Sequence, residues 1–280
     1  MKKRILSNGI EMPCMAIGTN WMTYKELKPI IKAGFEAGFR AVDTARDYGN
    51  EPIVGAVVKD VLREMGMKRS DIFITTKIGN SQQISSDFEK QLEISLENLQ
   101  TDYIDLWLLH WPYPDFYQKS WKAIETIYQQ KRDKVYAIGV ANFQERHFRQ
   151  LFDTHPTIVP MVNQMEFHPL RTCPSLVNYM NEHRIILEAY APLCRLVSPL
   201  RTTPVLTDLQ NKYNKSIGQI ILRWHIQQGS IPVFKSYREN RFTENVAIFD
   251  FELTKEEMLA ISSLNIDYKY HLESASCPGY

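Results

Sequence analysis

Three side chains able to do acid–base chemistry stand at the ends of consecutive apolar stretches. The stretch "FRAVD" ends in Asp43, "IFITTK" ends in Lys77, and "YIDLWLLH" ends in His110. They are spaced by roughly 30 residues, the length of one strand with its crossover helix. Because neighbouring parallel strands lie about 4.8 Å apart, their carboxyl ends would place these side chains at one rim. Tyr48 follows Asp43 in the loop "TARDYGNE" and can lean over the same place.

This set of side chains predicts proton donation to a carbonyl oxygen. A lysine in a partly buried site needs a carboxylate beside it, and Asp43 supplies one to Lys77. A cation beside Tyr48 favours the phenolate, so we expect the pKa of the phenol to fall from its usual value of about 10. Tyr48 would then donate the proton, while His110 would donate a hydrogen bond that fixes the direction of the carbonyl.

Other interpretations of these residues stay open from the side chains alone. Taken by itself, His110 is more typical of a hydrogen-bonded core histidine than of a catalyst. Lys77 could instead be the Schiff-base lysine of a barrel aldolase, since that chemistry also uses a lysine at a strand end. Asp43 disfavours the aldolase because a neighbouring carboxylate keeps the amine protonated.

Polar side chains at three later strand ends suit a nicotinamide ring. Asn142 closes "VYAIGVAN", Gln164 lies in "MVNQME", and Tyr190 lies in "IILEAYAP". Two amides can bracket a carboxamide, and an aromatic face can stack under the ring and leave its other side exposed for hydride transfer.

The last apolar stretch predicts a phosphate site. "IPVFKS" ends in Lys235 and Ser236, and the helical segment after it carries Arg241 and Asn245 on one face. Barrels commonly bind phosphate at their last strands and a helix N-terminus. Singly, these cations would be ordinary surface charges, but together they match the 2′-phosphate of NADPH, which arginine can bind with two parallel hydrogen bonds. We therefore expect NADPH/NADP+ rather than NAD(H).

The elements that must position these residues are short strands alternating with helices. Apolar stretches predict strands at 15–18, 39–45, 72–77, 103–110, 135–142, 161–166, 185–192 and 231–236. Amphipathic segments between them predict helices at 24–37, 87–99, 120–130, 145–152, 174–183 and 216–228.

This alternation predicts an α/β fold, a closed (β/α)8 TIM barrel that spans residues 1–280 as a single domain. An open doubly wound sheet is the alternative, weakened because neither G-x-G-x-x-G nor a G-x-x-x-x-G-K-[ST] phosphate loop occurs. Asn8-Gly9 predicts an N-terminal hairpin with a type I′ turn.

Composition limits the partners. The 280 residues carry a net charge of +1, which provides no electrostatic footprint for nucleic acid or a membrane surface, so we expect a small-molecule partner. The four cysteines are scattered without zinc spacing, no apolar run approaches 18 residues, and no export signal is evident. We expect reduced thiols, a cytoplasmic location and no metal, since H-E-x-x-H and carboxylate clusters are also missing.

The sequence resembles the aldo-keto reductases, NADPH-dependent carbonyl reductases with an (α/β)8 barrel, over nearly its whole length. The matching motifs are "GFRAVDTARDYGNE", "DIFITTK", "YIDLWLLHWP", "IGVANF", "VNQMEFHP" and "KSYRENRFTEN". The resemblance implies reduction of an aldehyde or ketone to an alcohol with NADPH, and the reverse oxidation with NADP+. We expect a monomer or a weak oligomer.

Carried over residue by residue, the resemblance implies Tyr48 as general acid, Asp43 and Lys77 as the pair that tunes it, and His110 as the residue that orients the carbonyl. It implies a cofactor site made of Asn142, Gln164, Tyr190, Leu193, Lys235, Ser236, Tyr237, Arg241, Glu244 and Asn245.

Around that site, the N-terminal hairpin would close the bottom of the barrel, and Trp21 and Trp111 are expected to wall the substrate pocket. One departure stands out: Ala141 replaces a common serine, so one hydroxyl contact to the carboxamide is missing. A rival of another class is a regulatory barrel that binds NADPH with negligible turnover, which the intact set of four catalytic residues disfavours.

Overall fold

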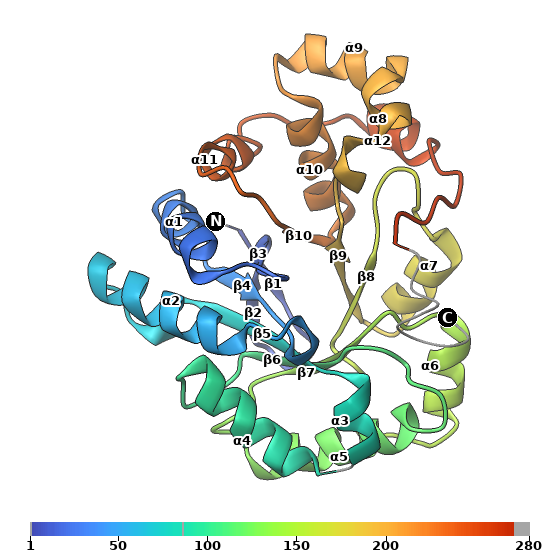
Figure 1. The fold of residues 1–280 in the computed structure, drawn as a ribbon. Helices are drawn as coiled ribbons and strands as arrows, with labels where there is room; N and C mark the ends of the chain where they lie inside the picture. The colour runs from blue at the N-terminus through green and yellow to red at the C-terminus, as the bar shows by residue number, and fades with distance from the viewer. Residues whose placement is uncertain (1, 86, 272–280) are drawn as a thin grey trace.

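The strands in the described part of the chain form a closed parallel barrel. The computed structural model describes residues 2–85 and 87–271. Within them, eight strands pair in the order β10-β3-β4-β5-β6-β7-β8-β9, and the helices surround them (Figure 1). The strands are β3 (Ala16–Gly18), β4 (Ala41–Asp43), β5 (Phe73–Ile78), β6 (Leu106–Leu109), β7 (Ile138–Ala141), β8 (Val162–Glu166), β9 (Ile186–Tyr190) and β10 (Ile231–Phe234). The predicted barrel is confirmed.

The barrel strands are buried on both faces, which explains why they read as apolar runs. Every residue of β5 and of β6 is buried, because one face of each strand fills the barrel and the other packs under helices. Except for β5, the strands are shorter than the predicted stretches: β4 has three residues, within the predicted 39–45. The flanking polar residues belong to loops that form the rims.

The helices lie between consecutive strands and around the last strand. Their bounds are α1 (Tyr24–Glu36), α2 (Glu51–Met65), α3 (Asn80–Ser85), α4 (Phe88–Leu99), α5 (Tyr117–Gln130), α6 (Glu145–Phe152), α7 (Pro174–Glu182), α8 (Ser198–Thr202), α9 (Pro204–Tyr213), α10 (Ile217–Gln228), α11 (Asn240–Val246) and α12 (Lys255–Ser262), with short 3-10 turns η1 (Arg46–Tyr48), η2 (Arg69–Asp71) and η3 (Cys194–Leu196). The six predicted helices are present with small shifts at their ends.

Helix α2 was not predicted, although its buried residues Val54, Val57, Val58, Val61 and Leu62 recur at helical spacing. Its Gly55 contacts the backbone of α4: a Cβ at that position would lie 2.5 Å from the carbonyl oxygen of Asn98. The missing side chain therefore allows the two helices to pack closely.

A two-stranded hairpin precedes the barrel, formed by β1 (Lys3–Ile5) and β2 (Glu11–Pro13). The predicted type I′ turn is wrong: Gly9 has a φ of +88°, but Asn8 does not have a positive φ. The Gly9 N–H donates to the Leu6 carbonyl, as in a type I turn followed by a left-handed glycine, and the Asn8 side chain accepts from the Ile10 N–H instead. The Asn8 side-chain amide also donates to the Tyr136 carbonyl, just before β7, so the hairpin lies at the amino end of the barrel strands.

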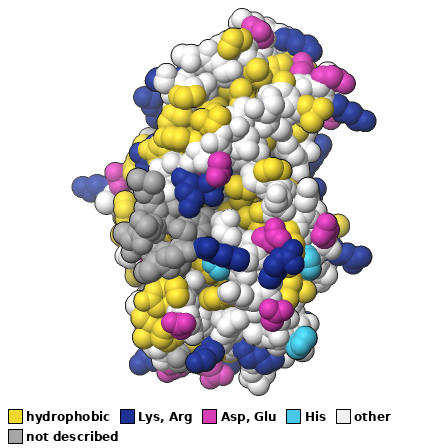
Figure 2. All heavy atoms as spheres, turned by 90° about the vertical axis from the view of Figure 1, so that its right-hand side faces the viewer, with side chains coloured by type: hydrophobic (Ala, Val, Ile, Leu, Met, Phe, Trp, Pro, Cys, Tyr) yellow, Lys and Arg dark blue, Asp and Glu magenta, His cyan; other side chains and the backbone are white. Residues whose placement is uncertain are grey.

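The surface is mixed in charge. On the face shown in Figure 2, basic and acidic side chains are interspersed. Among the described residues, no helix has both the length and the apolar composition needed to span a bilayer. Cys14, Cys173 and Cys194 are free thiols, and Cys277 lies outside the described residues.

Candidate active site

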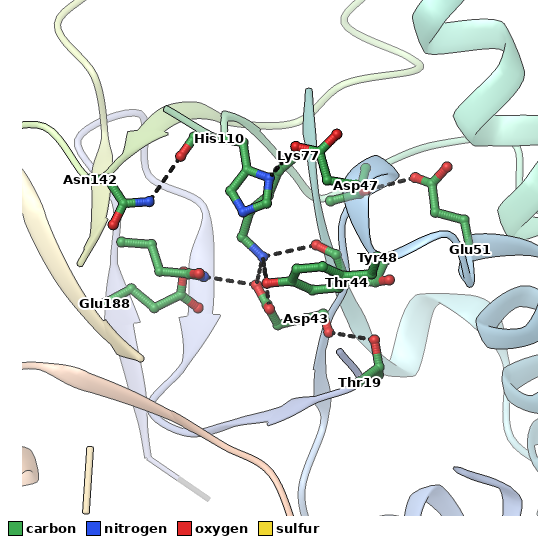
Figure 3. A network of polar contacts seen from close by, with 12 residues as sticks. Thr19, Asp43, Thr44, Asp47, Tyr48, Glu51, Lys77, His110, Asn142 and Glu188 are labelled. Carbon is green, nitrogen blue, oxygen red and sulfur yellow. Dashed lines mark hydrogen bonds and ion pairs between the residues drawn. The ribbon is translucent and has the colours of Figure 1, made fainter. Parts of the chain in front are cut away.

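The structure brings Asp43, Tyr48, Lys77 and His110 together at the carboxyl end of the barrel (Figure 3). The Lys77 ammonium lies 2.8 Å from both carboxylate oxygens of Asp43 and 2.9 Å from the Thr44 carbonyl oxygen. It lies 3.3 Å from the phenol oxygen of Tyr48. The ring centroids of Tyr48 and His110 are 5.7 Å apart, in an edge-to-face arrangement.

Each of the four is held by a local feature of the fold. Asp43 ends β4, and Lys77 is the penultimate residue of β5, so adjacent strands present the ion pair. Tyr48 ends η1, and Gly49 after it has a φ of +67°, which lets the chain turn directly into α2. His110 follows β6 and its N–H donates to the Ile78 carbonyl, which extends the sheet by one bond.

Lys77 is a buried ammonium and not a free amine. Its side chain is fully buried, and burial, the largest single effect, lowers its pKa. Asp43, with smaller contributions from Tyr48 and Glu188, opposes burial, and together they raise the pKa of Lys77 well above its usual value. A protonated lysine is a poor nucleophile for Schiff-base formation, so the ion pair with Asp43 disfavours the aldolase interpretation.

The expected fall in the pKa of Tyr48 is wrong. Burial raises the pKa of this phenol, and the nearby Asp43 and Glu188 carboxylates add to the rise, while the Lys77 cation opposes it without cancelling it. The spacing in the sequence reveals the cation beside the phenol but not the loss of solvent around it. Tyr48 is therefore firmly protonated at neutral pH, which is the state that a proton donor needs.

His110 is held from one side by a carboxylate that the sequence reasoning missed. Asp47 Oδ2 lies 3.1 Å from His110 Nδ1. Burial lowers the pKa of His110; the hydrogen bond to Asp47 opposes this fall, whereas the Lys77 cation adds to it. The imidazole ring is also stacked on Trp111, with the ring centroids 6.0 Å apart.

Glu188 is a second residue that sequence reasoning missed. It lies in the middle of β9, fully buried, and its Oε2 accepts a 2.7 Å hydrogen bond from the Gln164 side chain. Burial and the Asp43 charge raise the pKa of Glu188 to about 8. The signal was present: Glu188 is the one charged residue of "IILEAYAP" and lies two residues before Tyr190, which places both on the same face of the strand.

Gln164 and Asn142 present opposite hydrogen-bonding groups. The Gln164 amide nitrogen donates to Asp43 at 2.8 Å and to Glu188, so both of its hydrogens are used and its oxygen is the group left to accept. The Asn142 oxygen accepts from the Tyr190 hydroxyl at 2.9 Å, and its nitrogen gives one hydrogen to the His110 carbonyl at 3.0 Å, so one N–H is left to donate. The Gln164 oxygen, as acceptor, and the remaining Asn142 N–H, as donor, match the NH₂ group and the carbonyl oxygen of a carboxamide.

The predicted phosphate residues lie after β10. Arg241 donates from Nη1 to both carboxylate oxygens of Glu244, at 2.9 and 2.7 Å, which leaves its other guanidinium nitrogens for an anion. Glu244 also accepts from the Ser216 hydroxyl. Asn245 is buried on α11, and the Ser236 hydroxyl contacts the backbone of Arg238.

Lys235 reaches in another direction. Its ammonium donates to the Asn20 carbonyl oxygen at 2.5 Å, on the loop after β3, and lies 4.7 Å from the centre of the exposed Tyr237 ring. The Lys235 ammonium therefore contacts a different part of the structure from the Arg241–Glu244 pair.

The predicted pocket walls differ in exposure. Trp21, next to Asn20, is 75% exposed and has a φ of +56°, whereas Trp111 is buried and its carbonyl oxygen accepts from the Gln83 side chain. Leu193 is half buried, at the start of η3. Within residues 2–85 and 87–271, no group of three or more His, Cys, Asp or Glu side chains is arranged to hold a metal ion.

Comparisons with known proteins agree with the fold. A glyoxal reductase of Bacillus subtilis is 43% identical over 263 residues, which cover 94% of this chain and 92% of that protein. The methylglyoxal reductase DkgA of Escherichia coli is 36% identical over 265 residues, covering 93% of this chain and 92% of that one.

A Bombyx mori aldo-keto reductase, solved in complex with NADP, superposes with a TM-score of 0.87 at 31% identity, covering 100% of this chain and 98% of that one. The sequence profile described as the Aldo/keto reductase family matches residues 14–266. The chain belongs to the aldo/keto reductase family.

Proposed function

We propose that this chain reduces an aldehyde or ketone with NADPH, and that Tyr48 delivers the proton to the carbonyl oxygen. Carbonyl reduction with NADPH is the activity of the family to which the chain belongs. The observation that carries the residue roles is the Lys77 ammonium, 2.8 Å from Asp43 and 3.3 Å from the Tyr48 hydroxyl.

The ion pair explains how a phenol can act as the acid. Tyr48 holds its proton in the resting site because burial raises its pKa. When the carbonyl oxygen gains negative charge, the phenol gives up that proton, and Lys77 stabilises the phenolate that forms. Asp43 keeps Lys77 charged throughout, and His110 lies beside the phenol ring to direct the carbonyl.

The described side chains fit NADPH. Bound there, NADPH supplies the hydride that goes to the carbonyl carbon. The Gln164 oxygen would accept from the carboxamide NH₂, the remaining Asn142 N–H would donate to the carboxamide oxygen, and Tyr190 would stack on the ring. Arg241, Glu244 and Asn245, with Ser236, Tyr237 and Leu193, would line the rest of the cofactor path, with Lys235 moving from Asn20 to a phosphate.

Small dicarbonyl compounds are the first substrates to test. Two bacterial relatives are named for glyoxal and methylglyoxal, and both match more than nine-tenths of this chain. Exposed Trp21 and buried Trp111 would contact such substrates at the mouth. We further propose that residues 1–280 act as one barrel domain, as a monomer or weak oligomer in the cytoplasm, which the free Cys14, Cys173 and Cys194 thiols support.

The test is the rate of NADPH oxidation with glyoxal, methylglyoxal and a panel of larger aldehydes and ketones. We expect turnover with at least one of them and none with NADPH alone. Tight NADPH binding without turnover on any carbonyl would favour the regulatory barrel. A covalent lysine adduct trapped by borohydride would instead support the aldolase function.

A further inference from the structure

The Asp47 carboxylate faces the Nδ1 atom of the His110 imidazole (Figure 3). Asp47 Oδ2 lies 3.1 Å from His110 Nδ1, and the exposed fractions of the two side chains are 37% and 11%. Asp47 and Tyr48 are neighbours in η1, so one short turn of helix positions both the phenol and the partner of the imidazole.

The end of β5 leaves room for this carboxylate. Gly79 follows the last residue of β5, and a Cβ on Gly79 would lie 1.8 Å from Asp47 Oδ1. Any side chain at that position would therefore displace Asp47 from its contact with His110. The pairing depends on two positions, a carboxylate at 47 and a missing side chain at 79.

The carboxylate decides where the histidine carries its proton. An ionised carboxylate can only accept, so the His110 nitrogen facing Asp47, Nδ1, must carry hydrogen. A neutral imidazole has one N–H, and its other nitrogen, Nε2, then has only a lone pair. A carbonyl oxygen is also only an acceptor. Neutral His110 in this tautomer cannot hydrogen-bond a carbonyl, whereas the imidazolium can, because both of its nitrogens donate.

We propose that Asp47 locks the His110 proton on Nδ1, so that His110 orients a carbonyl substrate only as imidazolium and reduction is favoured at acidic pH. The inference rests on the proposed function, because it concerns the substrate oxygen in carbonyl reduction. His110 contributes a hydrogen bond to the carbonyl oxygen and no second proton transfer. The proton that reaches the product still comes from Tyr48.

The charged groups around His110 set where this change occurs. Burial and the Lys77 cation from β5 lower the pKa of His110, and Asp47 from η1 and Asp43 from β4 raise it, with a net fall below 6.5. Tyr48 faces the ring edge-on and is neutral. The imidazolium is therefore the main form only in the acidic range.

The tautomer can be read directly by NMR of the ¹⁵N-histidine-labelled protein at pH 8. The His110→Gln variant assigns the His110 signals by their loss. We expect a protonated Nδ1 and an unprotonated Nε2 in the wild type, and a population with protonated Nε2 in Asp47→Ala. A wild-type His110 with its proton on Nε2 at pH 8 would overturn the proposal, whatever the activity.

The pH dependence of kcat/KM for carbonyl reduction provides a second readout. In the wild type we expect an acidic plateau and an alkaline plateau lower by about 10- to 100-fold, which is the effect of one hydrogen bond to a charged donor. In Asp47→Ala the neutral ring can place its proton on Nε2, so this step should disappear while reduction continues at alkaline pH.

The matched control is Asp115→Asn. Asp115 is an exposed carboxylate on the loop that follows His110, and asparagine tolerates its φ of +66°. It should keep the wild-type profile. The same step in Asp47→Ala as in the wild type would refute the proposal. If the wild type reduces no carbonyl at all, the proposed function fails, and the NMR tautomer alone decides the role of Asp47.

Discussion

At the scale of single residues, the protonation of Tyr48 results from two opposing effects. Burial raises the pKa of the phenol, and the Lys77 cation, 3.3 Å from its oxygen, lowers it. The phenol therefore keeps its proton until negative charge develops on the substrate. In the same cluster Glu188 shows the cost of a second buried carboxylate, since its pKa rises to about 8.

Replacing Tyr48 by phenylalanine should abolish reduction and spare NADPH binding. The change removes the donated proton, so we expect kcat to fall by at least about 100-fold. The measurements are steady-state rates and NADPH affinity from fluorescence titration. Turnover within a few-fold of the wild type would contradict the role of Tyr48.

Replacing Glu188 by glutamine should stabilise the protein at alkaline pH. The pKa of Glu188 is raised to about 8 in the folded state from the usual 4.5, so the folded state binds one proton more than the unfolded state between these values. The wild type therefore loses stability as pH rises from 4.5 to 8, with a slope approaching about 1.4 kcal/mol per pH unit.

Urea denaturation at pH 5 and pH 8 measures this effect. Glu188→Gln should lose less stability over that interval than the wild type. Glu97→Gln, on the exposed face of α4, is the control and should follow the wild type. Parallel behaviour of Glu188→Gln and the control would show that Glu188 does not bind the extra proton.

At the scale of elements, the carboxyl ends of the strands bring the residues of the site together. Parallel pairing aligns β4 with β5 and β8 with β9, so Asp43 and Lys77 meet at one side of the barrel and Gln164 meets Glu188 at another. The bond from Gln164 to Asp43 then joins the two pairs across the barrel interior. Helix α11, after β10, carries the predicted phosphate residues.

Replacing Arg241 by alanine should weaken NADPH binding far more than NADH binding. NADH lacks the 2′-phosphate that this guanidinium would contact, so we expect the KM for NADPH to rise about tenfold or more and that for NADH to change little. Arg238→Ala, an exposed arginine nearby, serves as the control. Equal losses for both cofactors would rule out a 2′-phosphate contact.

At the scale of the whole molecule, long-range contacts hold the barrel and its surroundings together. Glu166, at the end of β8, accepts from the backbone N–H groups of Tyr270 at 2.6 Å and His271 at 2.9 Å, which fixes the C-terminal segment beside Tyr190. Nearby, His225 of α10 is fully buried, contacts the Pro192 carbonyl and Ser230, and packs edge-to-face against Phe167.

The buried His225 should make the fold sensitive to acid. Burial lowers its pKa to about 3, so the unfolded state binds a proton below pH 6.5 that the folded state does not bind. Stability should therefore fall as pH falls from 6.5 to 3, by about 1.4 kcal/mol per pH unit from this group. Urea denaturation from pH 7 to pH 4 should give a smaller pH slope for His225→Gln than for exposed His155→Asn. Identical slopes would show that another group causes the acid sensitivity.

The sequence by itself determined the barrel, the family resemblance and the candidate catalytic set. These depend on features that are local in the chain: apolar runs of strand length, helical periodicity, and polar residues placed directly at strand ends. Lys77 and Asp43 could be paired before any coordinates because consecutive parallel strands must lie side by side. The turn at Asn8-Gly9 was placed correctly, but its type was wrong, because only Gly9 of the pair has a positive φ.

Only the tertiary structure decided the protonation states and the partners. The pKa of Tyr48 moves in the opposite direction to the prediction because burial, which no spacing reveals, outweighs the cation. The Asp47–His110 and Gln164–Glu188 contacts join residues 63 and 24 positions apart, and their distances depend on how loops and strands close around the barrel. Electrostatic effects depend on distance and on solvent exclusion, and both are properties of the folded chain.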